Sequence, residues 1–138
     1  MRIPFFLQVT DMSFMFHKSE FNGNIGGWNV REVRLMDSMF SESPFNKTID
    51  GWQVVSLVSS SAMFRKATDF NQDLSTWVLG KVVNMLSMFE DASAFNGHIT
   101  QWATRSVEDV SKMFANASSF NQTMDHWNCS SCSNMNVC

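Results

Sequence analysis

The chain has 138 residues, of which 44% are hydrophobic and 17% charged, and its formal net charge at pH 7 is −3. This length suits one domain, and the hydrophobic content is enough to bury a core. Its ten Lys and Arg residues are scattered, so no basic stripe indicates nucleic-acid binding, and no apolar run approaches the roughly 18 residues of a membrane span.

A repeat of 24 to 25 residues runs through the chain. A Met-Phe pair, a Phe-Asn pair and one tryptophan recur in each repeat, and the tryptophans are Trp28, Trp52, Trp77, Trp102 and Trp127. A period in this range is typical of a solenoid, whose coils stack to bury a common core. We therefore predict a single repeat array over residues 1–138. Its coils begin near Val9, Val33, Leu57, Val82 and Val107, with a partial coil from Cys132. Both ends fall inside a repeat, so we expect the chain to be part of a longer protein.

The first half of each coil predicts a short helix. At 100° per residue, one apolar stripe about 120° wide collects five positions of the second coil. These are Val33, Met36, Met39, Phe40 and Ser43. The residue aligned with Ser43 is small in every coil, as close packing between neighbouring coils would require (Ser19, Ala67, Ala92 and Ala117).

The second half of each coil predicts a short strand. In Ile49-x-x-Trp52-x-Val54 the apolar residues end in an alternation of two, and stacked coils would pair such strands in parallel, about 4.8 Å apart. The predicted fold class is therefore α/β. We expect a leucine-rich-repeat-like solenoid of about five 24–25-residue coils, each with a short helix and a short parallel strand.

An asparagine follows the second phenylalanine of every coil (Asn22, Asn46, Asn71, Asn96 and Asn121). We predict a structural role for this row. An inward-turned Asn can satisfy backbone groups where the chain bends, and it can bond to its counterpart in the next coil.

The joined pattern V-x-x-M-x-x-M-F-x-x-A-x-x-F-N-x-x-I-x-x-W-x-V resembles the repeat of the BspA-like leucine-rich-repeat surface proteins. More narrowly, it resembles the mycoplasma-type 25-residue repeat family of unknown function. Residues 63–77 carry the resemblance most fully, whereas Ser60, Thr104 and Val110 depart from it. The resemblance implies a surface-exposed or secreted protein that acts in adhesion or protein binding. It brings no catalytic residues.

Recognition would use the outward positions that flank the inward Trp and Val. The predicted partner-binding residues are Asn29, Arg31, Gln53, Val55, Val78, Gln101, Arg105, His126 and Asn128. These side chains are mostly small and polar, without the aromatic anchors of tight binding sites, so we expect modest affinity per coil and strength through multivalency.

Enzymatic chemistry has no signature here, since no Ser/His/Asp arrangement, Gly-rich phosphate loop or paired carboxylates stand out. We predict a non-enzyme without cofactor or metal. The three cysteines, Cys129, Cys132 and Cys138, leave alternatives open. They are small buried hydrophobes, or a disulfide in an oxidising compartment, or a zinc site that lacks a fourth ligand unless His126 supplies it.

These observations predict a protein-interaction or adhesion module of a surface or secreted repeat protein. Its partner would be a protein or a surface glycan, and neighbouring coils of a longer array would adjoin it. The alternative is a structural spacer, or a truncated repeat fragment with no partner of its own. The resemblance places the protein outside the cell or at its surface, although the opening residues are too short for a signal peptide.

Overall fold

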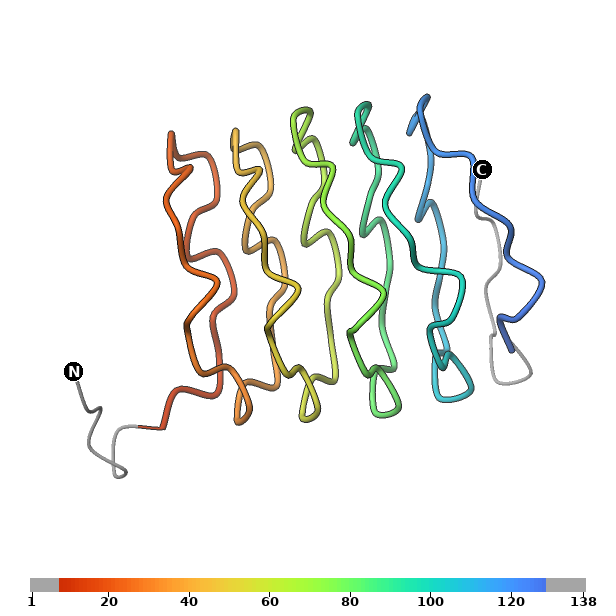
Figure 1. Cartoon of the computed structure of the whole chain (residues 1–138), viewed down its shortest axis with the longest axis horizontal. Coiled ribbons are helices and arrows are strands. Elements are labelled where there is room, and N and C mark those ends of the chain that lie inside the picture. Colours follow the sequence, from red (N-terminus) through yellow and green to blue (C-terminus); the bar gives the residue numbers. More distant parts are fainter. Residues whose placement is uncertain (1–7, 129–138) are drawn as a thin grey trace.

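The structure is a computed structural model that describes residues 8–128. Five coils lie side by side in chain order along the long axis of the molecule (Figure 1, red to blue). They are coil 1 (residues 9–32), coil 2 (33–56), coil 3 (57–81), coil 4 (82–106) and coil 5 (from 107). Equivalent residues of adjacent coils are 24 or 25 positions apart and bond to one another. Cys129, Cys132 and Cys138, and the partial coil expected from Cys132, lie outside the described residues.

Residues 8–128 contain no α-helix and no β-strand. Pairing of the β type is confined to four isolated parallel bridges between the third residues of successive coils: Asp11 with Leu35, Leu35 with Ser59, Ser59 with Asn84, and Asn84 with Asp109. The predicted α/β fold, a leucine-rich-repeat-like solenoid of helix-plus-strand coils, is therefore wrong.

The segment predicted to be helical is a ribbon whose N–H groups serve two kinds of partner in turn. In coil 1 the N–H groups of Phe14 and Phe16 donate across to the carbonyls of Asp37 and Met39 in coil 2, each at 2.9 Å. Between them, the N–H of Met15 donates at 3.3 Å to the carbonyl of Met12 and closes a turn within coil 1. The same alternation recurs in coils 2 to 4, and it pairs the backbone without a helix.

Two residues of each ribbon have a left-handed backbone, four positions apart. They are Phe14, Lys18, Ser38, Glu42, Ala62, Lys66, Ser87, Asp91, Lys112 and Asn116, with φ between 54° and 62°. None of them is a glycine, which is the residue that usually marks this conformation in a sequence. The turns of the ribbon join residues three positions apart, such as Met36 and Met39, and a helix produces a similar apolar spacing.

The close spacing of the coils explains why a helix does not fit. The rings of Phe40 and Phe64, in adjacent coils, have centroids 5.6 Å apart, and the same row runs at 5.4 to 5.8 Å through the stack. Packed helices need about 8–10 Å between their axes. A flat ribbon can bond to its neighbour at the shorter spacing, whereas a helix cannot.

The segment predicted to be a strand forms turns instead. The N–H of Trp52 donates to the carbonyl of Ile49, and the N–H of Leu57 donates to that of Val54, each at 3.1 Å. These N–H groups are therefore not available for a ladder between coils. The alternation in burial is nevertheless present, because Trp52 and Val54 are buried while Gln53 is exposed.

Three aromatic rows form the core. Within each coil the two phenylalanines stack at 3.9 to 4.0 Å. Between coils the second phenylalanine row repeats at 5.9 to 6.2 Å, and the Trp row at 6.0 to 6.4 Å from Trp52 to Trp127. The Phe members are buried in coils 2 to 4 and half-buried in coils 1 and 5. Each of coils 2 to 4 is thus covered by its two neighbours, as in other repeat arrays.

The tryptophans of coils 2 to 5 also fix the register of their coils. Trp52 Nε1 donates to the carbonyl of Ile25 at 3.0 Å, and Trp77 Nε1 donates to that of Ile49 at 3.1 Å. The bond recurs from Trp102 and Trp127 to the coils before them. A shift of one residue would remove this partner from all four of these indoles.

The asparagine row forms the predicted bonds to its counterparts. The Oδ1 of Asn22 accepts the N–H of Asn46 at 2.8 Å, and the pattern continues to Asn121. The expected inward orientation is wrong, because these residues are exposed, apart from the half-exposed Asn46. The row satisfies backbone N–H groups at a surface bend.

Candidate functional site

The outer face comprises the nine residues that the sequence predicts to bind a partner. All nine are exposed: Asn29, Arg31, Gln53, Val55, Val78, Gln101, Arg105, His126 and Asn128. Each coil contributes to this face, and Val30 and Val54, which lie between pairs of these positions, are buried. Their role in binding stays a prediction.

Three residues of the outer face come together at coils 1 and 2. Asn29, Arg31 and Gln53 line a shallow depression of about 230 Å³, together with Trp28. The Arg31 guanidinium donates to Gln53 Oε1. The N–H of Arg31 donates to Asn29 Oδ1 at 3.1 Å, which orders the turn that carries both side chains.

Trp28 adds an aromatic surface to this depression. Its side chain is 39% exposed, whereas Trp52 is 1% exposed. Trp28 is the first tryptophan of the row. The sequence pattern placed Trp28 in the core with the other tryptophans, and its exposure corrects that expectation.

The other members of the outer face continue along coils 2 to 5. Val55 and Val78 are among the exposed large hydrophobic residues, and they give this surface a mild apolar character between its polar groups. Gln101, Arg105 and His126 extend the exposed row over coils 4 and 5. The face is therefore long and shallow, a shape suited to an extended partner.

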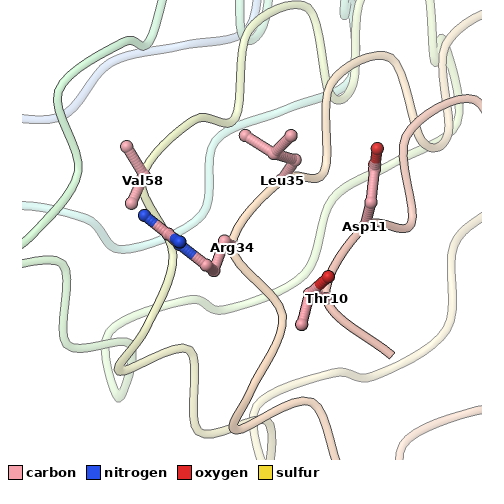
Figure 2. A pocket seen from close by; sticks show the side chains of 5 residues that line it. All are labelled: Thr10, Asp11, Arg34, Leu35 and Val58. Carbon is pink, nitrogen blue, oxygen red and sulfur yellow. The ribbon is translucent and has the colours of Figure 1, made fainter. Parts of the chain in front are cut away.

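A second depression, of about 330 Å³, crosses coils 1 to 3 and was not predicted. It is lined by Thr10, Asp11, Arg34, Leu35 and Val58. Figure 2 shows the Arg34 side chain extending toward Val58 and away from Asp11. These are the second and third residues of their coils, where the residue type varies from coil to coil, so the sequence pattern gave no signal for them.

The electrostatics of the second depression rest on one carboxylate and one guanidinium. The backbone N–H of Ser13 donates to the Asp11 carboxylate at 2.8 Å and holds its pKa below the usual value of 3.8. Asp11 is therefore charged at neutral pH. Together with Arg34 it can form charge-assisted hydrogen bonds with a polar ligand.

Within residues 8–128, no three His, Cys, Asp or Glu side chains are grouped so that they could hold a metal ion. The described part of the chain also has no helix with the length and apolar character to cross a membrane.

A family model described as "Mycoplasma protein of unknown function, DUF285" matches the chain twice, over residues 6–89 and over residues 43–138. The two matches overlap, as expected where one repeat pattern fits an array in more than one position. Comparisons with curated proteins and with solved structures give no significant match.

Proposed function

We propose, from the premise that the chain belongs to the DUF285 family of mycoplasma proteins of unknown function, that it is a non-enzymatic interaction or adhesion module of a surface or secreted repeat protein. The two matches confirm the expected mycoplasma-type repeat family. We propose that the chain shares only its location and its binding role with the BspA-like proteins. The leucine-rich-repeat fold is not part of this proposal.

The observation that supports this proposal most strongly is the depression at coils 1 and 2. An indole ring, a guanidinium and two amide groups, from Trp28, Arg31, Asn29 and Gln53, share one open surface. Aromatic and Arg side chains are the residues that most often dominate binding energy at interfaces. Amides beside an aromatic ring can bond to a peptide backbone or to sugar hydroxyls, and both classes of ligand remain in the proposal.

The remaining outer face would add weaker contacts along the array. A partner that spans several coils gains from effective concentration, because each further contact is formed within an existing complex. The proposal therefore requires that substitutions on the outer face of coils 2 and 4 weaken binding, as substitutions in coil 1 do.

Binding of the fluorescently labelled chain to intact cultured epithelial cells tests the proposal. The test variant is Asn29→Ala, Gln53→Ala and Gln101→Ala combined, and the control combines Lys47→Ala, Thr68→Ala and Ser93→Ala, which are exposed residues outside the outer face. We expect the test variant to bind about tenfold more weakly and the control to bind like the wild type, with similar unfolding temperatures.

Pretreatment of the cells separates the two ligand classes. Loss of binding after protease points to a protein, and loss after glycosidase alone points to a glycan. If the wild-type chain does not bind, or if both variants bind equally well, the outer face is not the recognition surface. The spacer alternative would then be favoured.

A further inference from the structure

Two asparagines of the exposed asparagine row are followed by glycine. They are Asn22 in coil 1 and Asn96 in coil 4, and glycine follows no other member of the row. Gly97 is required by the packing of coils 3 and 4, because a Cβ added there would lie 2.2 Å from the carbonyl oxygen of Gln72. The stacking of the coils therefore keeps an Asn-Gly pair at this surface bend.

An asparagine followed by glycine can react with its own backbone. The backbone nitrogen of the glycine attacks the side-chain carbon Cγ of the asparagine and forms a C–N bond. The side-chain nitrogen leaves as ammonia, with the proton of the attacking nitrogen. Water then opens the resulting cyclic imide at either carbonyl, which gives aspartate or isoaspartate. Glycine favours the attack because it has no Cβ to obstruct the approach. Water is the only other reactant.

The hydrogen bonds of the asparagine row oppose this reaction, because they hold each side-chain amide toward the next coil. For the attack, Cγ must instead turn back to the backbone nitrogen that follows it in its own coil. Asn22 is held by one bond, in which its Oδ1 accepts the N–H of Asn46 at 2.8 Å. Lys47, the next residue of coil 2, is exposed, and no second donor among the described residues reaches Asn22 Oδ1.

Asn96 is held more firmly, by a glutamine of the next coil. Its Oδ1 accepts the N–H of Asn121 at 2.8 Å and also Nε2 of Gln122 at 3.0 Å. Gln122 Nε2 donates in addition to the backbone carbonyl of Asn96 at 3.1 Å. We call this pair of bonds from one glutamine the glutamine clamp. Two further hydrogen bonds lower the population of a released side chain about tenfold.

We propose that Asn22 is a site of spontaneous deamidation in the folded protein, and that the glutamine clamp protects Asn96 from the same reaction. Deamidation of Asn22 places a new carboxylate between coils 1 and 2. In the aspartate product, a side-chain oxygen still accepts the N–H of Asn46. In the isoaspartate product, the backbone runs through the former side chain and is one carbon longer. This displaces the acceptor and weakens the contact between the two coils.

The asparagine row contains its own controls, because it combines the clamp and the glycine in every way. Asn71 has no clamp and is followed by Gln72. Asn46 has the clamp, since Gln72 Nε2 donates to its Oδ1 at 2.9 Å and to its carbonyl at 3.1 Å, but it is followed by Lys47. Because neither precedes a glycine, both should stay intact while Asn22 reacts.

The experiment follows deamidation of the full chain during incubation at neutral pH, by peptide mass spectrometry that separates aspartate from isoaspartate. In the folded protein we expect Asn22 to react about tenfold faster than Asn96. In the chain unfolded by guanidinium chloride the clamp is absent, so the two sites should react at similar rates. The proposal is overturned if Asn22 stays intact in the folded protein, or if both sites react equally fast there.

Two reciprocal substitutions test the clamp itself. Lys47→Gln supplies a glutamine to Asn22 and should slow its deamidation about tenfold, whereas Gln122→Lys removes the clamp and should accelerate the reaction of Asn96 by a similar factor. The control is Gln101→Lys, at an exposed position away from the asparagine row, which should change neither rate. If either reciprocal substitution leaves its rate unchanged, the clamp does not protect and the proposal fails. Unchanged circular dichroism shows that each variant is folded.

Discussion

Left-handed residues without glycine are the local feature that most distinguishes this chain. A non-glycine residue in this conformation costs about 1–2 kcal/mol relative to the right-handed one. Two such residues occur in every coil, among them Ala62 and Lys66 in coil 3. Hydrogen bonds between coils offset this cost, because the left-handed residues of coils 1 to 4 each donate their N–H to the next coil.

Replacing Ala62 by glycine should therefore stabilise the protein. Ala62 has φ 54°, and glycine adopts this conformation without steric cost, so we expect a gain of about 0.5–1 kcal/mol. Ala115→Gly is the control, because Ala115 is not among the left-handed residues and should lose about 0.5–1 kcal/mol. Chemical denaturation measures both. In a helix both substitutions would be destabilising, so equal losses would contradict the ribbon.

The Trp indole bond predicts a cost that depends on position in the array. Trp77→Phe removes the donor to the carbonyl of Ile49 and leaves a gap in a buried row, so we expect a loss of about 1–3 kcal/mol. Trp28→Phe should cost less than about 1 kcal/mol, because its side chain is 39% exposed. Thermal unfolding in dilute solution compares the two. Equal costs would mean that the indole bonds contribute little.

Acid should weaken the protein in part through Asp73. The backbone N–H of Ser75 donates to this carboxylate at 2.9 Å and lowers its pKa from the usual value of 3.8. A lowered pKa in the folded state stabilises the protein above pH 3.8, and this contribution is lost as the pH falls through the lowered value. The difference in unfolding free energy between wild type and Asp73→Asn should therefore shrink below pH 4. A constant difference would exclude this linkage.

At the scale of one coil, the sequence predicted which positions are buried but not which element carries them. Val33, Met36 and Met39 are buried as expected, since burial follows from spacing alone. The same spacing also fits a helix. The short distance between coils excludes the helix, and this distance cannot be read from the sequence of a single repeat. Residues of the outer face, such as Gln53, are exposed as expected, because buried and exposed residues alternate in this part of the coil. The depression at Arg34 is formed by side chains from three different coils, so the pattern of a single repeat could not predict it.

Charges alternate along one ridge of the array, at the ninth and tenth residues of successive coils. This ridge runs from His17-Lys18 to Ser41-Glu42, Arg65-Lys66, Glu90-Asp91 and Ala115-Asn116. Arg65 lies 3.9 Å from Glu42 and 3.4 Å from Glu90, and Lys66 lies 4.0 Å from Glu42. The basic pair of coil 3 therefore has acidic neighbours in both adjacent coils, which favours the native order of coils over a shifted one.

Reversing one charge on this ridge should destabilise the intact chain. Glu42→Lys places a third cation beside Arg65 and Lys66, and we expect a loss of about 0.5–1 kcal/mol that decreases as salt is added. The control is Asp69→Lys, at an exposed position off the ridge, which should change stability by less than about 0.5 kcal/mol. Urea unfolding at low and high salt measures both. A loss independent of salt would show that charge is not the cause.

The whole molecule behaves as a one-dimensional stack, because the contacts of each coil are made with its neighbours. Coils 2 and 4 carry the same aromatic positions, so removing residues 57–81 joins Phe40 to Phe89 and Phe45 to Phe95 in register. We expect the shortened chain to fold with lower stability than the full array, since one interface is lost.

The deletion also brings like charges together, and this reverses the effect of one substitution. Without coil 3, Glu42 lies beside Glu90 and Asp91, so Glu42→Lys should stabilise the shortened chain by about 0.5–1 kcal/mol. The same substitution destabilises the intact chain, where its neighbours are Arg65 and Lys66. Urea unfolding of the four proteins in parallel gives both differences. A change of sign shows that the ridge acts between coils, whereas the same sign in both backgrounds would mean that Glu42 acts within its own coil.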